Sequence, residues 1–562
     1  MRYHLEINII SYHINKYIEI IRKDMEIIYK DMEIIYKDNI IIGAGPAGLQ
    51  LSYFFHINNI EYLLIEREDT CGSFFQKYPH SRNMISLNKK FTGSDNSDFN
   101  LRHDWNSMLN NENHLFTNYS EKFYPESDLL HQYLNDFCNL NKLNINFNTI
   151  VTSIDKINET YKLYTKNTTY ICKKLIVATG TSIPIIPNFK LNIGKKIMHY
   201  SDFPLKYFKD INNLKKYENK KLVIFGSGNS AYELGNILNE YCSSIFIIGR
   251  KVDLSMVSHY VGDVRSIYYP FFDTFYLKTL NGIDELDKNL HKEIEIVQIT
   301  DINNDNYNKY ELRLNNRPFY GNHKNNFFDE VIFCTGWKFD STIFNFNVEL
   351  TINDKYPKIK YNYESTNNGN LFFIGALMHS HDYRKSSGGF IHGFRYLIKL
   401  FTQINYEIPY DTCFFDFDGT MKCYTDLTNQ IFKKINISSN LYQMNGILLD
   451  VFYYDNAKKR INYINNITFE VACKLVNQSS TFTTVKLTYG SKNYDLKTIN
   501  SFNKNDPKFL HPEIITYERE NMFDGYKLID TIIIEEDIIS DFSSDKVFKK
   551  ILKTLKGCPL IL

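Results

Sequence analysis

Short apolar runs alternate with helix-like segments along the chain as far as Asn405. The runs Ile40–Ile42 and Tyr62–Ile65 flank a predicted helix over Ala47–Phe55. Short apolar runs bounded by glycines are typical of buried parallel strands, and strands that alternate with helices predict βαβ units. We therefore expect an α/β fold with a parallel sheet.

Three glycines stand directly after the first run. Gly43, Gly45 and Gly48 have the G-x-G-x-x-G spacing of a dinucleotide-binding turn. Gly43 makes the tight turn, Gly45 lets a pyrophosphate approach the backbone, and Gly48 lets the following helix pack close to the strand. The N-terminus of that helix, at Pro46 and Ala47, is expected to face the phosphates.

An acidic residue, Glu66, follows the second run at about 20 residues from the first glycine, where a carboxylate meets the adenosine ribose hydroxyls in this fold. A glycine-rich turn without a ligand is the alternative, but it does not explain Glu66. Strand, glycines, helix and acid together predict a bound dinucleotide.

A second copy of the pattern lies in the middle of the chain. The run Lys221–Phe225 leads into a G-x-G-x-x-A turn and a predicted helix over Tyr232–Leu238, and the next run, Ser244–Ile248, is followed by Arg250 and Lys251. A carboxylate there would repel a 2′-phosphate, whereas an arginine binds one through charge-assisted hydrogen bonds. The first site therefore suits FAD and the second suits NADPH; a solvated strand end is the alternative interpretation of the two cations. The second turn consists of Gly226, Ser227, Gly228, Asn229, Ser230 and Ala231.

Three further runs end in glycine where two nucleotide domains would join. Lys174–Gly180 and Glu330–Gly336 each close on Thr-Gly, where chains of this type cross between domains. Leu371–Gly375 is the third, and a glycine-started helix is predicted after it, with N–H groups aimed at the flavin ring or ribityl chain. The cofactor-binding candidates from these segments are Thr179, Gly180, Gly336, Gly375, Gly388 and Gly389.

These motifs predict two Rossmann-like dinucleotide-binding domains, with the NADPH domain inserted into the FAD domain. The FAD domain is expected at 38–215 and 336–405, the NADPH domain at 216–335, and a mixed C-terminal module at 406–562. Apolar residues spaced by alternating steps of four and three predict a helical arm over 1–37. The arm repeats K-D-M-E-I-I-Y in tandem. A replication slip is an alternative origin of this repeat, with no structural meaning.

The composition narrows the class of protein. The 562-residue chain has a net charge of +1, which argues against nucleic acid as a partner. We expect no membrane-spanning helix, because no apolar run of about 18 residues occurs. Nine cysteines form no C-x-x-C or C-x-x-x-x-C pair, so the dithiol of a disulfide reductase is not expected. Cys71 is the thiol nearest to the expected flavin, with buried packing as its alternative role.

Longer strings resemble one family within the flavin monooxygenase-like, two-dinucleotide-binding flavoproteins. The chain is similar to the second FAD-dependent oxidoreductase-domain family, the endoplasmic-reticulum flavoproteins associated with degradation. The resemblance implies an FAD-binding oxidoreductase linked to quality control of misfolded secretory proteins, with Ser73 and Phe74 at the cofactor. The strings are Gly72–Phe75, Phe99–Asn106, Ser258–Asp263, Asp382–Lys385, Gly388–Tyr396, Leu441–Met444 and Phe509–Pro512.

Two compartments stay open. The resemblance implies the lumen of the endoplasmic reticulum. However, the chain ends Cys558–Leu562 without a retention tetrapeptide, and charges interrupt Met1–Lys23, where a signal peptide has an apolar core. The cytoplasm is therefore the alternative.

Few residues carry a catalytic prediction. Asn88 stands where monooxygenases of this class place an asparagine beside the flavin, and a turn cap is its alternative role. His199 and Phe203 resemble the end of the monooxygenase fingerprint, but Gly194 lies one residue too far from the histidine. Charged residues that would line the cleft, with salt bridges as the alternative, are His259, Asp263, Arg384 and Lys385.

Three functions fit the sequence. The first is an NADPH-dependent flavin oxidoreductase that passes electrons to oxygen or another acceptor and acts on small molecules or protein thiols. The second is a flavin monooxygenase of small nitrogen or sulfur substrates. The third is a non-catalytic flavoprotein whose C-terminal module binds protein partners. The oligomeric state stays open.

Overall fold

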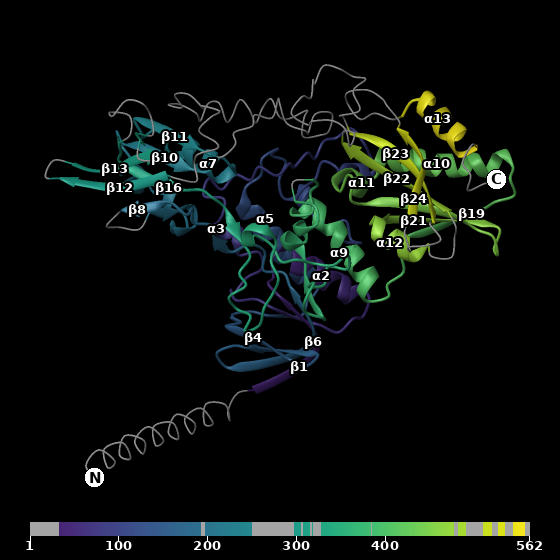
Figure 1. Ribbon diagram of the computed structural model, residues 1–562, viewed down its shortest axis with the longest axis horizontal. Helices are drawn as coiled ribbons and strands as arrows, with labels where there is room; N and C mark the ends of the chain where they lie inside the picture. The colour runs from purple at the N-terminus through teal and green to yellow at the C-terminus, as the bar shows by residue number, and fades with distance from the viewer. Residues whose placement is uncertain are drawn as a thin grey trace, which may run out of the picture.

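The computed structural model describes residues 33–192, 197–249, 297–304, 307–314, 317–318, 327–383, 385–476, 481–489, 510–519, 526–533 and 543–556. The fold is α/β, as predicted, with parallel sheets of the Rossmann type. A central domain holds the first glycine turn, a second domain with the second turn lies at one end of the molecule, and a C-terminal module lies at the other (Figure 1).

The central domain is built on a seven-stranded sheet. Its parallel part runs β3-β2-β1-β6-β18, and β4, β5 and β6 form an antiparallel meander on the same sheet. The elements are β1 (Glu33–Ile42), α2 (Pro46–Ile57), β2 (Leu63–Ile65), α3 (Phe74–Lys77), α4 (Ser97–Asn100), η1 (Phe116–Asn118), α5 (Ser127–Leu140), β3 (Ile145–Asn146), β4 (Ser153–Ile157), β5 (Thr160–Tyr164), β6 (Thr168–Val177), η8 (Ile352–Asp354), β18 (Leu371–Phe373), η9 (Gly375–Ser380) and α9 (Ile391–Asn405).

The predicted helical arm is wrong at its C-terminal end. Residues 33–37 belong to β1, in parallel register with β6 from Glu33 opposite Thr168 onward. The backbone of β6 supplies hydrogen-bond partners to this segment. This long-range pairing outweighs the local spacing of apolar residues, which fits a strand as well as a helix. The remainder of the arm, residues 1–32, lies outside the described residues.

The second domain has a four-stranded parallel sheet in the order β11-β10-β16-β9, beside a five-stranded sheet of β8 and β12–β15. The elements are β7 (Ile183–Pro184), β8 (Lys190–Asn192), β9 (Met198–His199), η2 (Tyr200–Asp202), η3 (Tyr207–Lys209), α6 (Ile211–Lys215), β10 (Lys221–Phe225), α7 (Asn229–Leu238), β11 (Ser244–Ile248), β12 (Val297–Asn304), β13 (Tyr307–Leu314), β14 (Arg317–Pro318), β15 (Phe327–Phe328), β16 (Glu330–Phe333) and β17 (Trp337–Lys338).

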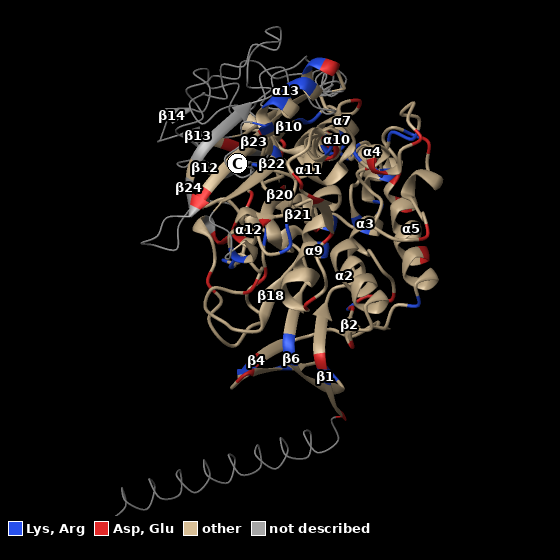
Figure 2. Cartoon of the chain, turned by 90° about the vertical axis from the view of Figure 1, so that its right-hand side faces the viewer, with Lys and Arg blue, Asp and Glu red and all other residues tan. Residues whose placement is uncertain are grey.

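The C-terminal module is a six-stranded antiparallel sheet in the order β19-β21-β20-β22-β23-β24. Its last helix, α13, packs Val547, Ile551 and Leu555 inward and turns its lysines to the solvent (Figure 2). The elements are β19 (Thr412–Asp416), α10 (Met421–Ile437), α11 (Ser439–Gln443), β20 (Leu449–Asp455), β21 (Arg460–Ile467), α12 (Phe469–Leu475), β22 (Thr481–Tyr489), β23 (Leu510–Arg519), β24 (Tyr526–Ile533) and α13 (Asp545–Lys556).

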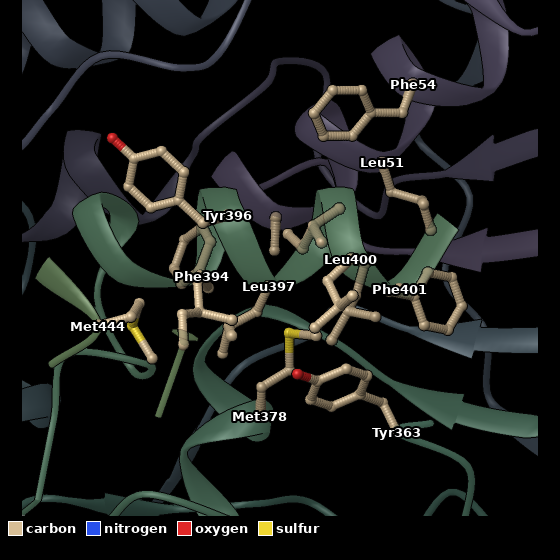
Figure 3. Close-up of a cluster of buried hydrophobic side chains, with 14 of the residues drawn as sticks. Leu51, Phe54, Tyr363, Met378, Phe394, Tyr396, Leu397, Leu400, Phe401 and Met444 are labelled. Carbon is tan, nitrogen blue, oxygen red and sulfur yellow. The ribbon is translucent and has the colours of Figure 1, made fainter. Parts of the chain in front are cut away.

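One hydrophobic core runs through both the central domain and the C-terminal module. Helix α9 lies at its middle: Phe401 and Leu400 lie toward Leu51 of α2, while Phe394 lies toward Met444 (Figure 3). The second domain, by contrast, has two hydrophobic clusters of its own on the two faces of β10. The C-terminal module is therefore continuous with the central domain in its packing, and the second domain is separate.

Candidate functional site

The first glycine turn lies at the carboxyl end of β1. Gly43 has a φ of +103°, which a side chain would strain, and its N–H donates to Ile65 at 2.8 Å. A Cβ on Gly48 would collide with the carbonyl oxygen of Gly43, so this glycine sets the close approach of α2 to the turn. A Cβ on Gly45 would meet no atom within 4 Å. The space before α2 is thus open to a ligand.

Helix α2 offers its N-terminus to that space. Gly45 is its N-cap, no side chain caps the helix, and Pro46 fills one of its first two positions. The remaining N–H groups of the first turn and the helix dipole favour an anion such as a pyrophosphate. Ala47 packs beneath η9, because a Cβ on Gly375 would collide with the Ala47 side chain. The residues present therefore fit the phosphates of a dinucleotide.

Glu66 lies against this turn, as its spacing predicts. The side chain is buried, and its carboxylate accepts hydrogen bonds from the N–H of Ala44 at 2.6 Å and from that of Glu68 at 3.0 Å. A carboxylate has about four acceptor positions, so two backbone bonds leave capacity for a ribose hydroxyl. Contact between Glu66 and a ribose stays a prediction.

The predicted pair Ser73 and Phe74 begins α3 beside the same turn. The N–H of Gly72 donates to the carbonyl oxygen of Ala44 at 2.9 Å, which holds this segment against the turn. Ser73 is the N-cap of α3 and its side chain makes no capping bond, while the ring of Phe74 is exposed. Both residues are thus near the phosphate turn.

The two Thr-Gly crossings lie side by side. Gly180 and Gly336 both have positive φ, and the strands that follow them, β7 and β17, pair with each other. Thr179 follows Ala178, whose N–H donates to the carbonyl oxygen of Ile42 at 2.8 Å, next to the first glycine turn. The connections between the central and second domains therefore begin at the dinucleotide site.

The predicted glycine-started helix begins later than expected. Helix α9 starts at Ile391 with Phe390 as N-cap, and Gly388 and Gly389 precede it. A Cβ on Gly388 would collide with Asp382, and one on Gly389 with His379. Their missing side chains thus serve close packing, and the N-terminus that can face a flavin is that of Ile391.

A buried hydrogen-bonded pair of His379 and Asp382, which no motif predicted, supports this turn. Asp382 accepts a hydrogen bond from the Gly388 N–H at 2.6 Å and pairs with Nδ1 of His379 at 2.8 Å. The signal in the sequence is His and Asp three residues apart, just before a glycine pair. The pair fixes the entry to α9, where His392 stacks on Trp105 with ring centroids 4.3 Å apart.

Asn88 is buried and only half satisfied. Its amide nitrogen donates to the carbonyl oxygens of Ser120 at 2.6 Å and Lys122 at 3.1 Å, while its Oδ1 has no hydrogen-bond partner. Asn88 bridges to Asp104, the neighbour of Trp105, so its strand lies next to the residues at the start of α9. The available atom is therefore an acceptor, and a flavin or nicotinamide contact stays a prediction.

The second glycine turn repeats the first. Gly226 has a φ of +118° and donates to Ile248 at 2.7 Å, while a Cβ on Gly228 would meet no atom within 4 Å. Asn229 and Ser230 begin α7, and Ala231 is buried where the first turn has its third glycine. The predicted cations Arg250 and Lys251 lie outside the described residues. So do Gly194, His259, Asp263 and Arg384; Lys385 is described and its N–H donates to Asp382.

A polar junction, which the sequence did not reveal, joins the central domain to the second domain. Glu233, on α7, accepts from the Ser81 N–H at 2.5 Å and from the Tyr200 hydroxyl at 2.8 Å. The His80 N–H donates to the Tyr200 hydroxyl at 2.9 Å, and the His80 ring packs on Tyr200 and Phe203. We call His80, Ser81, Tyr200 and Glu233 the domain junction.

Burial governs the acid–base state of the domain junction. Desolvation raises the pKa of Glu233 above its ordinary value and lowers that of His80, because both charged forms are disfavoured out of water. Desolvation also raises the pKa of Tyr200. His199, from the predicted fingerprint, caps η2 through Ser201, and Phe203 packs in the junction, so both have structural contacts here.

Other kinds of site are not found in the described part of the chain. No group of three or more His, Cys, Asp or Glu side chains there is arranged to hold a metal ion. Within the same residues, no helix has the length and apolar character needed to cross a membrane.

Comparison with known proteins agrees with the two-turn architecture. A family model described as pyridine nucleotide-disulphide oxidoreductase matches residues 40–375. FAD-dependent oxidoreductase domain-containing protein 2 of Mus musculus is 34% identical over 470 residues, which cover 77% of this chain and 67% of the mouse protein. The Danio rerio protein of the same name is 31% identical over 460 residues, covering 73% of this chain and 64% of the fish protein. The chain thus spans about two thirds of these relatives.

Among solved structures, a flavin-containing monooxygenase from Stenotrophomonas maltophilia aligns over 66% of this chain and 99% of its own, with 15% identity and a TM-score of 0.43. The extent of the family match and the identity to the mouse protein decide the assignment. The chain belongs to the pyridine nucleotide-disulphide oxidoreductase family and, within it, to the FAD-dependent oxidoreductases related to FAD-dependent oxidoreductase domain-containing protein 2.

Proposed function

We propose that this protein is an NADPH-dependent flavin oxidoreductase, in which the second domain presents NADPH to an FAD held by the central domain. The observation that supports this most is the duplication of one site. Each domain has a strand, a glycine turn and a helix, and in each turn the middle glycine borders open space. Family membership supports FAD in the first site.

In the first site, each group has a defined task. The N-terminus of α2 neutralises the pyrophosphate, and the open side of Gly45 leaves room for it. Glu66 accepts the ribose hydroxyls with its remaining lone pairs. The N-terminus of α9 would stabilise negative charge on the ring system. FAD, when bound, supplies the two-electron chemistry, and the protein supplies position and electrostatics.

In the second site, the N-terminus of α7 takes the pyrophosphate of NADPH, and Arg250 and Lys251 take its 2′-phosphate. The domain junction holds the second domain against the central domain and would thereby set how closely the two nucleotides approach. Glu233 lies on α7, the helix that binds the NADPH phosphates, and holds the Ser81 N–H of the central domain. A displacement of about 1 Å between reacting groups costs on the order of 100-fold in rate, so this contact contributes to hydride transfer.

Arg250→Ala tests the NADPH assignment. We expect kcat/KM to fall at least about tenfold with NADPH and little with NADH, because only NADPH carries the 2′-phosphate that the guanidinium pairs with. Lys215→Ala, an exposed lysine of the same domain, is the control. An equal loss with both nucleotides would contradict a role of Arg250 at the 2′-phosphate.

A monooxygenase is the second candidate, and Asn88 is the observation that favours it. Its buried, unpartnered Oδ1 next to the start of α9 can accept a hydrogen bond from a group on the flavin or from the nicotinamide amide. The products distinguish the two activities. A hydroxylated amine or an S-oxygenated thioether identifies a monooxygenase, whereas one hydrogen peroxide formed for each NADPH consumed with oxygen identifies an oxidase. Protein with FAD but no NADPH consumption identifies a binding role.

The family relationship also motivates a proposed location in the lumen of the endoplasmic reticulum, with misfolded secretory proteins as partners. Three Asn-x-Ser/Thr sequons, at Asn118, Asn158 and Asn167, are exposed. In the lumen, these side chains are acceptors for N-glycosylation. We expect an endoglycosidase to increase the gel mobility of the protein isolated from its own cells, and Asn→Gln at these three to reduce the shift. Asn→Gln at the other three sequons as well, at Asn436, Asn466 and Asn477, should abolish it. Unglycosylated wild-type protein would favour the cytoplasm.

A further inference from the structure

Two cysteines that are distant in the sequence meet beside the first glycine turn. Cys71 lies between β2 and α3, and Cys138 lies in the last turn of α5. Each thiol is the main influence on the pKa of the other, as expected of neighbouring thiols, and both are buried and unoxidised. The two cysteines come from different elements, so the short spacings that mark a reductase dithiol, such as C-x-x-C, do not reveal them.

Helix α5 holds Cys71 in this position through hydrogen bonds to the backbone of Cys71. Asn135 accepts from the Cys71 N–H at 3.1 Å and donates to the Cys71 carbonyl oxygen at 3.2 Å. Thr70 also donates to the Asn135 side chain, at 2.8 Å. Asn135 and Cys138 are three residues apart on one face of α5, so the same face that binds the Cys71 backbone presents the second thiol. The pairing is therefore built into the backbone rather than into two flexible side chains.

The two thiols are not equivalent. Donation of a hydrogen bond to Cys138, together with burial, raises the pKa of Cys71. Acceptance of that bond lowers the pKa of Cys138 below its ordinary value. Cys138 is also the more accessible, at 6% exposure against 1% for Cys71. Since the thiolate is the nucleophile, Cys138 is the thiol that reacts first with an oxidant.

We propose that Cys71 and Cys138 are a redox pair that a small peroxide converts into a disulfide. The Cys138 thiolate attacks hydrogen peroxide, which gives a sulfenic acid and hydroxide. The Cys71 sulfur then attacks that sulfenic sulfur, an S–S bond forms, and water leaves with the Cys71 proton. In sum, two thiols lose two electrons and two protons, and one peroxide becomes two waters. Only a small oxidant suits the site, because both thiols are buried.

The disulfide would tie the segment after β2 to α5. This segment also holds the first glycine turn, through the hydrogen bond from the Gly72 N–H to Ala44. The cross-link closes a long loop and removes conformational freedom from the unfolded chain, so it stabilises the folded protein. Oxidation would therefore rigidify the support of the dinucleotide site.

The test begins with the wild-type protein, with FAD bound, treated with hydrogen peroxide and then with an alkylating agent. Peptide mass spectrometry without reduction should find one cross-linked peptide that contains Cys71 and Cys138, and the count of free thiols should fall by two per chain. Dithiothreitol should restore both. Tm should rise on oxidation by on the order of 5 °C and return on reduction.

Matched variants separate a pair from general oxidation. Cys172→Ser changes another buried cysteine of the same domain and should leave the cross-link and the Tm rise intact. Cys138→Ala should abolish both; if it fails to fold, the wild-type peptide map alone decides. Sulfinic acid on Cys138 with Cys71 alkylated, a cross-link to a different cysteine, or two unreacted thiols would each overturn the proposal.

Discussion

At the residue scale, Gly45 and Gly48 of the first turn differ in what surrounds them. A side chain on Gly48 would collide with the protein itself, whereas one on Gly45 would enter empty space. Gly45 also has a φ of −74°, which alanine adopts without strain. The fold therefore explains why Gly48 has no side chain, whereas no contact within the protein explains it for Gly45.

Gly45→Ala and Gly48→Ala should thus fail in different ways. We expect Gly45→Ala to fold with nearly unchanged Tm in the absence of FAD and to lose FAD on purification. Gly48→Ala should be destabilised by about 1–3 kcal/mol or more even without FAD, as overpacked sites are. Absorbance at the flavin band and thermal unfolding of apoprotein measure the two effects. Gly369→Ala, an exposed glycine with room for a Cβ, is the control. Retained FAD in Gly45→Ala would refute the site.

The sequence predicted residues whose roles follow from local spacing and missed those whose partners are remote. Gly43, Gly45, Gly48 and Glu66 meet in one turn, as expected from a single βαβ unit. His379 and Asp382 were also missed, because Asp382 binds the His379 ring and the Gly388 N–H within a loop, and such contacts leave no periodic signal. Cys71 was singled out, but its neighbour Cys138 comes from α5, which no motif connects to it.

At the element scale, α7 and α9 show how helices position the site. Helix α7 begins directly after Gly228, whereas α9 begins at Ile391, with Phe390 between it and the glycine pair that was expected to start it. Two glycines before an amphipathic segment indicate either a helix start or close packing. Gly388 and Gly389 serve close packing, because a Cβ on either would collide with Asp382 or His379. Helix α7 also carries Glu233, which reaches across to a residue 152 positions earlier in the chain. Local patterns do not report such contacts.

The half-buried carboxyl of Glu233 makes the domain junction pH-dependent. Because its folded-state pKa is raised from 4.5, the protonated form is favoured in the junction. Its contribution to stability is thus full below pH 4.5 and is lost as the pH rises through the raised pKa. Glu233→Gln, which stays neutral, should remove this dependence: the Tm difference between wild type and variant should change in favour of the variant as the pH rises from about 4.5 toward neutrality.

The control for this prediction is Glu240→Gln, an exposed glutamate just beyond α7. It should follow the wild-type profile. Glu233→Ala, in contrast, leaves the Ser81 N–H and the Tyr200 hydroxyl without their acceptor, at about 1–3 kcal/mol for each buried group. It should slow flavin reduction by NADPH more than it weakens NADPH binding. Parallel pH profiles for wild type and Glu233→Gln would contradict a half-buried, titrating carboxyl.

At the scale of the whole molecule, the division into packing units differs from the order of motifs in the chain. Two parallel nucleotide-binding sheets were predicted and are present. The C-terminal residues gave no motif, so the sequence could not show that they share a hydrophobic core with the central domain. A buried arginine joins the two: Arg102 donates to the carbonyl oxygens of Ser438 and Ile435, both at 3.0 Å, and stacks on Tyr442.

Truncation tests this shared core. A chain that ends at Asn405 should be insoluble or unfolded, because Phe394 and Tyr396 of α9 would lose their cover. Excision of the second domain should be tolerated better. Residues Pro184 and Trp337 are paired in β7 and β17, so an Asn-Gly turn can join them directly. We expect the excised protein to be soluble and to retain FAD, as judged by size-exclusion chromatography and flavin absorbance. A folded chain ending at Asn405, together with an insoluble chain lacking the second domain, would contradict the shared core.

The most direct test of the central claim is anaerobic mixing of the FAD-loaded protein with NADPH while the oxidised-flavin absorption band is followed. The account predicts that the band bleaches, faster with NADPH than with NADH, because the second domain delivers the nucleotide to the flavin of the central domain. A protein whose flavin is bleached by dithionite but by neither nucleotide would contradict it, and would leave FAD as a structural group in a binding protein.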